Sequence, residues 1–104
     1  MPGGPLPFDD QHAPLYAVGQ VADMLGVQPA FVRRLDTEGV VSPQRTGGGQ
    51  RRYSQAEILC VRRVSQMADE GMTLAGIRRI LVLEQEVARL EHELEAERAR
   101  RRRS

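Results

Sequence analysis

Hydrophobic and polar positions first take up a regular spacing near residue 18. Val18, Val21, Ala22 and Leu25 recur at i, i+3, i+4 and i+7, which predicts a short helix with one buried face. Gly26 follows, and glycine is the residue that most often terminates a helix at its C-terminal end. The first predicted element is therefore a short amphipathic helix that ends at Gly26.

A second short helix is predicted directly after the first. Pro29 suits its first position, where the missing N–H costs nothing. Phe31, Val32 and Leu35 supply a buried face, and Gly39 ends the helix. Two short helices joined by a tight turn have the spacing of a helix-turn-helix, although any pair of antiparallel helices looks similar.

A β-hairpin is predicted next, in the stretch RTGGGQRRYS of residues 45–54. Residues 45–46 and 52–53 are expected to pair as two short strands around the glycines of 47–49, which give a flexible tip. Ser54 and Glu57 then form the S-x-x-E pattern of a capping box, so a third helix is expected to begin at once.

Two more helices complete the predicted globular part. Gly71 is expected to close the third helix and Thr73 to cap the fourth. Their buried positions are Ile58, Val61, Val64, Met67 and Ala68 in the third helix, and Leu74, Ile77 and Leu81 in the fourth. The fold class is therefore mainly α with a small β-hairpin, in the order of a winged helix-turn-helix domain.

A different period begins at residue 80. Apolar residues spaced three and four apart form the stripe of a coiled coil, which we call the seam and expect to mediate dimerisation. The seam consists of Ile80, Leu83, Val87, Leu90 and Leu94. We expect a disordered, Pro- and Gly-rich leader at 1–14, a winged helix-turn-helix domain at 15–81, a coiled-coil helix at 82–97 and a basic tail at 98–104.

Charge is segregated along the chain, although the formal net charge of its 104 residues is only +1. Residues 30–63 hold seven Arg against three acidic residues, residues 84–97 hold six Glu against one Arg, and residues 98–103 hold five Arg. Every cation is Arg, whose planar guanidinium suits phosphates and guanine edges. The first basic block therefore points to nucleic acid as a partner.

Other kinds of site have little support. Cys60 is the single cysteine, and its apolar neighbours favour a buried, inert thiol. Neither a set of metal ligands nor a nucleophile–base pair is recognisable, so we expect no metal, no cofactor and no enzymatic activity. The sequence shows no secretory signal and no membrane-spanning run, which predicts a cytoplasmic protein.

These features together resemble the MerR family of bacterial transcription regulators. The likeness runs through YAVGQVADMLGVQPAFVRRLDTEGVVSPQRTGGGQRRYS (16–54) and EGMTLAGIRRIL (70–81), and is greatest to the heat-shock repressor branch, HspR. It implies a homodimer, formed through an antiparallel coil, that represses chaperone genes from an inverted repeat with the chaperone DnaK as co-repressor. Helix 2 departs from the family pattern, because Arg34 and Leu35 stand where aromatic residues are usual.

The resemblance places the DNA contacts on the second helix and the hairpin. The candidate DNA-binding residues are Gln28, Ala30, Arg33, Arg34, Arg45, Thr46, Arg51, Arg52 and Tyr53. Arg33 and Arg34 point about 100° apart, so one is expected to reach a base edge and the other a phosphate. The alternative for these two is a surface ion pair with Asp36 or Glu38, and the alternative for Gln28 is a solvated turn residue.

The hairpin candidates carry alternatives too. Arg51 and Arg52 lie on opposite faces of a strand, so at most one points at phosphate while the other braces the hairpin. For Tyr53, packing in the core is the preferred role and a contact with phosphate is the alternative.

The flanks of the seam pose a problem for self-pairing. Glu84, Glu86, Glu91 and Glu93 are all acidic, so like charges meet when two copies pair. Dimerisation is therefore expected to be salt-sensitive or dependent on a partner, and arginines in the tail or at 62–63 and 78–79 of the second copy are candidates that compensate the acidic flanks. The alternative is that the coil buries enough of its seam against the globular body for these charges not to matter. The alternative function is a protein-interaction module that docks a sigma factor or a chaperone through this acidic coil.

Overall fold

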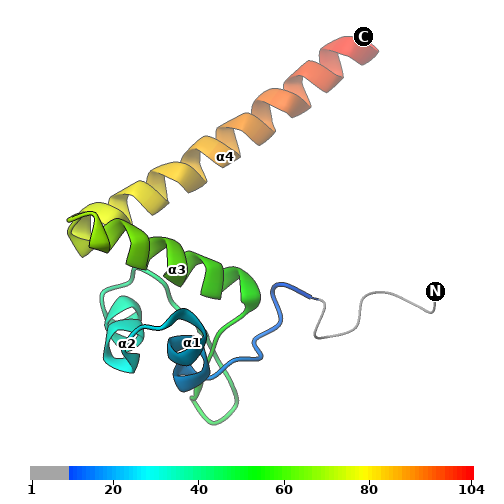
Figure 1. Cartoon of the computed structure of the whole chain (residues 1–104). Coiled ribbons are helices and arrows are strands. Elements are labelled where there is room, and N and C mark those ends of the chain that lie inside the picture. The colour runs from blue at the N-terminus through cyan, green and yellow to red at the C-terminus, as the bar shows by residue number, and fades with distance from the viewer. Residues whose placement is uncertain (1–9) are drawn as a thin grey trace.

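The structure is a computed structural model that describes residues 10–104. Its elements, in chain order, are α1 (Val18–Leu25), α2 (Pro29–Thr37), β1 (Gln44–Arg45), β2 (Arg51–Arg52), α3 (Gln55–Asp69) and α4 (Leu74–Arg103). In Figure 1, α1 and α2 lie below α3, the β-hairpin hangs beneath them, and α4 leaves the body as a long arm. The predicted fold class, mainly helical with one small hairpin, is confirmed.

The helices begin and end where the predicted capping residues stand. Gly26 takes a left-handed φ of 67° at the end of α1, a conformation that glycine adopts without strain. Pro29 occupies the first turn of α2. Ser54 Oγ accepts a hydrogen bond from the Glu57 N–H at 3.1 Å, and the Ser54 N–H donates to Glu57 Oε1 at 2.8 Å. The capping box at the start of α3 is therefore confirmed.

One hydrophobic core joins all four helices. Its buried members are Val21 and Ala22 of α1, Val32 and Leu35 of α2, Ile58, Val61, Val64 and Met67 of α3, Leu74 and Ile77 of α4, and Val41 and Tyr53 from the connecting segments. Apart from the two connecting residues, all of them are positions that the helical periodicity predicts. The other predicted positions are only half-buried against this core: Val18, Leu25, Phe31, Ala68 and Leu81. The start of α4 is thus part of the same packed body as α1–α3.

The hairpin is paired one residue earlier than predicted. Gln44 lies opposite Arg52 and Arg45 opposite Arg51, so the strands are 44–45 and 51–52 and not 45–46 and 52–53. Tyr53 instead pairs with Tyr16, with backbone hydrogen bonds of 2.7 and 3.0 Å in the two directions. The base of the hairpin is therefore fixed to the segment that precedes α1. We call residues 44–52 the wing.

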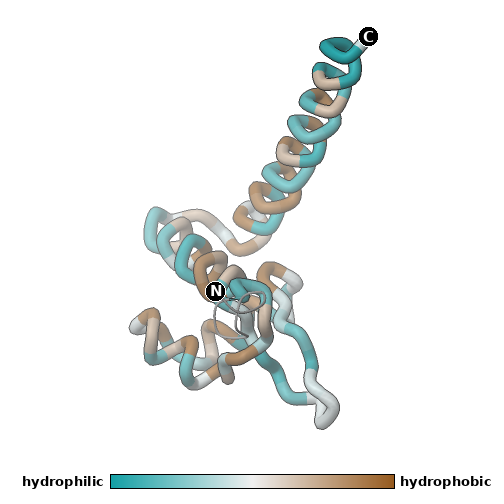
Figure 2. The backbone as a smooth tube through the Cα atoms, turned by 90° about the vertical axis from the view of Figure 1, so that its right-hand side faces the viewer, coloured by the Kyte–Doolittle hydropathy of each residue, from teal (hydrophilic) through white to brown (hydrophobic). Residues whose placement is uncertain are grey.

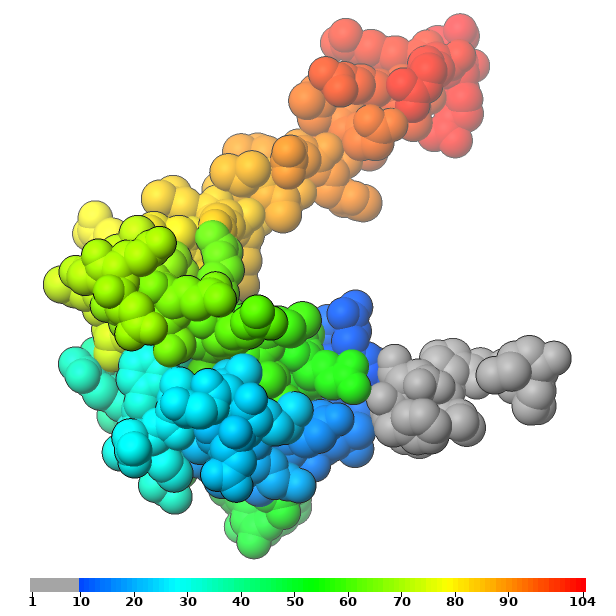
Figure 3. All heavy atoms as spheres, viewed as in Figure 1, coloured from blue at the N-terminus to red at the C-terminus, as the bar shows by residue number. Residues whose placement is uncertain are grey.

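α4 continues without interruption through both expected boundaries, at residues 81–82 and 97–98. It spans 30 residues, or about 45 Å at 1.5 Å per residue. Figure 3 shows that its second half stands clear of the body. None of the helices in residues 10–104 is long and apolar enough to cross a membrane.

The segment before α1 contacts the body. The Ala56 N–H donates to the Gln11 carbonyl at 2.9 Å, and Gln44 Nε2 donates to the His12 carbonyl at 3.4 Å. Residues 10–14, part of the expected leader, therefore lie against the start of α3 and β1. The rest of that leader, 1–9, lies outside the described residues.

Candidate nucleic-acid interface

α2 presents its polar residues on the surface opposite its buried face. Val32 and Leu35 are fully buried, which turns Gln28, Ala30 and Arg33 outward. Gln28 is the N-cap of α2 and makes no side-chain capping hydrogen bond. The N-terminal end of α2 is therefore exposed, and the helix dipole there favours an anionic group, although Pro29 has no N–H and the Phe31 N–H donates to the Gln28 carbonyl at 3.0 Å.

Asp36 attaches the wing to α2. Its Oδ2 atom accepts from Arg45 Nη2 at 2.7 Å and from Arg51 Nε at 2.6 Å, and only 10% of its side chain is exposed. Asp36 lies in the last turn of α2, where the helix dipole disfavours an acidic group. The two guanidinium groups compensate for that position, so one carboxylate joins the helix to both strands of the wing.

The two faces of the wing carry different arginines. Arg45 and Arg51 are directly opposite each other and share the face toward Asp36. The hydrogen bond to Asp36 raises the pKa of Arg51. Arg52 points the other way, where it donates to Gln50 Oε1 at 2.9 Å and to the Arg51 carbonyl. Of this neighbouring pair, Arg51 is therefore the one that braces the hairpin, and Arg52 is left on the opposite face.

Arg33 and Arg34 have different surroundings. Arg34 Nε donates to Glu38 Oε2 at 2.6 Å, so the predicted alternative of a surface ion pair describes Arg34. Within residues 10–104, no ion pair or side-chain hydrogen bond involves the Arg33 guanidinium. Arg33 precedes Asp36 by three residues and therefore lies on the same side of α2. Arg45 and Arg51 thus meet at Asp36, and Arg33 stands about one turn earlier on the same helix.

The glycine run forms the tip of the wing. The Thr46 N–H donates to the Gln50 carbonyl at 3.0 Å and the Gly49 N–H to the Thr46 carbonyl at 2.8 Å. This is the pattern of a three-residue hairpin loop, whose last residue is left-handed, and Gly49 has φ +76°. Gly47 and Gly48 do not have positive φ, and an added Cβ would meet no atom within 4 Å. The fold therefore requires glycine at position 49, but not at positions 47 and 48.

Tyr53 belongs to the core and not to the surface. It is fully buried, and its hydroxyl has no hydrogen-bond partner among the described residues. Burial, with a smaller contribution from the negative charge of Asp36, raises the pKa of this hydroxyl. The candidate phosphate contact of Tyr53 is therefore wrong for this conformation, because its hydroxyl does not reach solvent.

We expect Tyr53→Phe to leave the protein as stable as before, or more stable by up to about 1 kcal/mol, because it removes an unpaired buried polar group. Affinity for DNA should not change. Thermal unfolding and DNA titration of the variant measure both quantities. A large loss of DNA affinity with unchanged unfolding would contradict the packing role.

Cys60 is half-buried on α3. Burial is the main cause that raises its pKa, partly offset by the positive charge of Arg63. A raised pKa favours the thiol over the reactive thiolate at neutral pH, in line with the predicted inert cysteine. Residues 10–104 contain no cluster of three or more His, Cys, Asp or Glu side chains arranged to hold a metal ion.

Asp36 is the site residue whose role the sequence did not reveal. It was expected, if paired at all, to bind Arg33 or Arg34 on its own helix, but it binds the wing instead. The sequence signal for this is weak: an acidic residue near a helix C-terminus, where it is unfavourable, followed by a basic hairpin.

Comparison with known proteins identifies relatives of this arrangement. The family described as MerR HTH family regulatory protein matches residues 16–83. A Streptomyces coelicolor protein assigned as the heat shock protein HspR is 44% identical over 82 residues, covering 78% of this chain and 54% of the relative. The regulator GlnR of Bacillus cereus is 29% identical over 77 residues, covering 74% of this chain and 60% of GlnR. The chain thus spans little more than half the length of these two relatives.

Solved structures with the same fold are also found. A MerR-family transcriptional regulator from Bacillus cereus superposes with a TM-score of 0.59 at 19% identity, covering 85% of this chain and 70% of the regulator. The N-terminal part of the Bacillus subtilis multidrug transporter activator Mta gives the same TM-score at 21% identity, covering 78% and 92%. The family match across the helices and the wing, together with this shared fold, shows that the chain belongs to the MerR family of helix-turn-helix regulators.

Proposed function

We propose that the protein is a sequence-specific DNA-binding repressor that recognises an inverted repeat as a dimer. The observation that carries the proposal is the shared surface of α2 and the wing, held together by Asp36. A duplex that meets this surface can contact the helix and the hairpin at the same time. Because MerR-family proteins are regulators and not enzymes, the prediction that the protein is not an enzyme is confirmed.

On α2, Arg33 is the proposed base-reading residue. It is exposed and unpaired within residues 10–104, and it precedes by three residues the Asp36 that binds the wing. A bidentate Arg–guanine contact in the major groove discriminates between bases by about 1–3 kcal/mol. Gln28 and Ala30 stand at the helix N-terminus, the end that usually faces bases. Arg34 is proposed to contact phosphate, which requires it to exchange Glu38 for the DNA backbone.

On the wing, Arg52 and Thr46 are the proposed phosphate contacts. Arg52 is bound only to neutral oxygens of Gln50 and Arg51, so its charge is not neutralised by a carboxylate within the described part of the chain. Thr46 is exposed beside the tip. Arg45 and Arg51 are proposed to hold the wing in place and to add positive potential, because both already bind Asp36.

The proposed function is tested by titrating the protein with DNA fragments and measuring mobility shift at fixed salt. Arg33→Ala should lower affinity for the specific site by about 5- to 150-fold, the equivalent of one bidentate base contact. Non-specific DNA should lose much less affinity. An equal loss of affinity for specific and non-specific DNA would mean that Arg33 contacts only the DNA backbone. Absence of DNA binding by the unchanged protein at low salt would refute the proposal.

The glycines at the wing tip give a second test. Since Gly47 and Gly48 are not required by the fold, we propose that they leave room for the DNA backbone. Gly48→Ala should leave the unfolding temperature unchanged or slightly higher, because it restricts the unfolded chain by about 0.4–1 kcal/mol. Its affinity for specific DNA should fall. Gly49→Ala is the control, because it should destabilise the wing through its left-handed backbone by about 1–2 kcal/mol.

We further propose the domain division into a DNA-binding head at 15–81, a dimerisation helix at 82–97 and a basic tail at 98–104. Dimerisation through the seam is supported by its exposure, since Leu83 is 62% and Leu94 is 49% exposed in the single chain. Apart from Ile80, which is half-buried against the core, the seam is therefore not covered by the body of its own chain. Dependence of the dimer on salt or on another protein stays a prediction.

The relative assigned as a heat shock protein supports a role in the stress response. On that basis we propose that the regulated genes include chaperone genes and that a chaperone acts as co-regulator. Mapping the binding sites across the genome tests this proposal. Sites upstream of chaperone genes, arranged as inverted repeats, are the expected result.

The alternative function is a protein-interaction module that docks a sigma factor or chaperone through α4. The exposed apolar seam with its acidic flanks favours this alternative, because such a surface also fits a partner helix with basic flanks. A stable complex with another protein, together with no affinity for DNA at low salt, would support this alternative over the repressor.

A further inference from the structure

The C-terminal end of α2 is bound by an arginine of α4. Glu38 is the C-cap of α2, and its backbone carbonyl accepts a hydrogen bond from Arg78 Nη1 at 3.4 Å. Earlier in the same turn, the Leu35 carbonyl is satisfied locally, by the Val40 N–H at 2.8 Å. In Figure 3, the first turns of α4, in yellow, lie against α2, in cyan. A cation at this end of a helix is favourable, so Arg78 joins α2 to α4.

The carboxylate of Glu38, in contrast, is bound within α2. Its Oε2 atom accepts from Arg34 Nε at 2.6 Å, and both side chains are exposed. An acidic group at the C-terminal end of a helix is unfavourable unless a cation compensates for it, and Arg34 is that cation in the free chain. The proposed phosphate contact of Arg34 takes this cation away, so Glu38 then needs another partner.

Arg78 is the cation placed to receive Glu38. Both residues line a surface hollow of about 370 Å³ between the end of α2 and the start of α4, together with Thr37, Val40, Leu74 and Ala75. Within residues 10–104, Arg78 forms no ion pair, so no carboxylate compensates its charge. Because Arg78 Nη1 already contacts the Glu38 backbone, rotation of the two side chains into the hollow is the only movement that an ion pair requires.

The neighbouring arginine does not fit this role. Arg79 points about 100° away from Arg78 on α4, and it does not line the hollow at the end of α2. It lines a separate hollow with Val82 and Leu83. Arg79 is therefore a control for any effect that depends only on charge near the head.

We infer that the Glu38 carboxylate changes partner from Arg34 to Arg78 when Arg34 binds a DNA phosphate. Arg78 is thereby a positioning residue for DNA recognition that acts through Glu38. The inference rests on the proposed function, and in particular on the phosphate contact of Arg34. In the free chain Glu38 holds Arg34 along α2, whereas in the complex it ties α2 to α4. DNA binding and the attachment of α4 to α2 are therefore coupled, and the coupling acts in both directions.

A thermodynamic cycle of DNA affinity tests the change of partner. The unchanged chain, Arg78→Gln, Glu38→Gln and the double variant are titrated with specific DNA at fixed low salt. Arg78→Gln should lower affinity about two- to fivefold more in the unchanged background than in the Glu38→Gln background, because only the former loses an exposed ion pair. Arg78→Lys keeps the positive charge and should restore most of this affinity. Equal effects of Arg78→Gln in both backgrounds would overturn the inference.

The same cycle without DNA shows when the new ion pair forms. In the free chain Glu38 is bound to Arg34, so Arg78→Gln and Glu38→Gln should shift the unfolding temperature additively. Arg34→Gln imitates the complex, because it removes the first partner of Glu38. In that background the two shifts should become non-additive by about 1–4 °C. Non-additive shifts of this size in the unchanged chain, or additive shifts in the Arg34→Gln background, would each contradict the change of partner.

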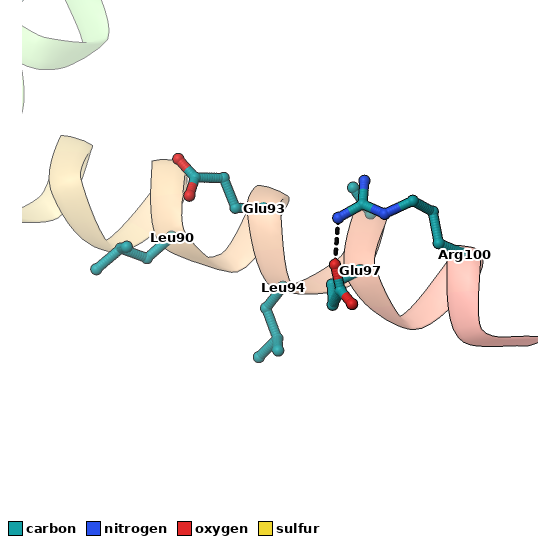
Figure 4. A pocket seen from close by; sticks show the side chains of 6 residues that line it. Leu90, Glu93, Leu94, Glu97 and Arg100 are labelled. Carbon is teal, nitrogen blue, oxygen red and sulfur yellow. Dashed lines mark hydrogen bonds and ion pairs between the residues drawn. The ribbon is translucent and has the colours of Figure 1, made fainter.

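Two other arginines of α4 are matched controls. Arg79→Gln makes the same substitution one residue further along, and Arg100→Gln makes it near the end of the helix. Figure 4 shows Arg100 bound to Glu97 on the distal part of α4, and Figure 2 shows hydrophilic segments, in teal, recurring along that arm up to the C-terminal end. The effect of either control on specific affinity should be the same with and without Glu38→Gln. A dependence on Glu38 as large as that of Arg78→Gln would indicate a general charge effect and overturn the role of Arg78.

DNA binding by the unchanged chain separates this inference from the proposed function. No affinity for DNA at low salt would refute the phosphate contact of Arg34 and the change of partner together. Specific binding without coupling between Glu38 and Arg78 would refute only the change of partner.

Discussion

Leu90→Glu is expected to convert the dimer into monomers and to abolish tight binding to an inverted repeat. Each dimer contains the change twice, and each copy loses about 1.5–3 kcal/mol of apolar burial and places a charge in the seam. The dimer Kd should therefore rise by roughly a thousandfold or more. Loss of simultaneous binding to two half-sites should lower DNA affinity by about a hundredfold or more.

The matched control for this change is His92→Glu. His92 is exposed on the side of α4 away from the seam, so the same glutamate there should leave the dimer intact. Sedimentation velocity measures the oligomeric state, and circular dichroism checks that α4 remains helical. A dimeric Leu90→Glu variant would show that the seam is not the interface.

Asp36→Asn is expected to release the wing from α2. The substitution preserves the shape of the side chain but removes the charge that holds Arg45 and Arg51. Those two like charges then face each other without compensation, so the unfolding temperature should fall. Because two guanidinium groups become available to phosphates, the salt dependence of non-specific binding should steepen by about one to two contacts.

The affinity of Asp36→Asn for the specific site should fall relative to its affinity for non-specific DNA. A wing that is no longer fixed to α2 does not present its phosphate contacts in register with Arg33, so the ratio of specific to non-specific affinity should fall tenfold or more. Titration of both DNAs over a range of salt concentrations measures this ratio. Thr37→Ala, on the same turn of α2, is the control. An unchanged ratio would show that Asp36 does not position the wing.

The sequence predicts the helices well because each is marked twice. A buried stripe such as Ile58, Val61 and Val64 identifies the body of a helix, and a capping residue such as Ser54 marks where the helix begins. The wing is predicted less accurately. Its strands have only two residues each, too few for an alternating pattern, so their register is fixed by the loop hydrogen bonds and by the pairing of Tyr53 with Tyr16.

The ion pairs of the site depend on packing that the sequence does not display. Asp36 and Arg51 come together only when the hairpin folds back on α2, and Arg63 reaches Glu84 only when α3 lies along α4. The negative charge on the flanks of the seam is therefore partly compensated by arginines of the same chain. By contrast, Arg34 and Glu38 are four residues apart on one helix, and an ion pair of this kind is among the alternatives that the sequence offers.

The uninterrupted α4 joins the head of the chain and its half of the proposed dimer interface through one continuous helix. Leu74 and Ile77 are buried in the head, while Leu90 and Leu94 lie on the same helix further along. Because the helix is continuous between these residues, pairing of two α4 helices in the proposed dimer would set both the distance and the angle between the two recognition helices. One residue inserted between 83 and 84 would turn a head by about 100° relative to its partner. Such a protein should tolerate changes of base sequence in its operator better than the gain or loss of a single base pair between the two halves.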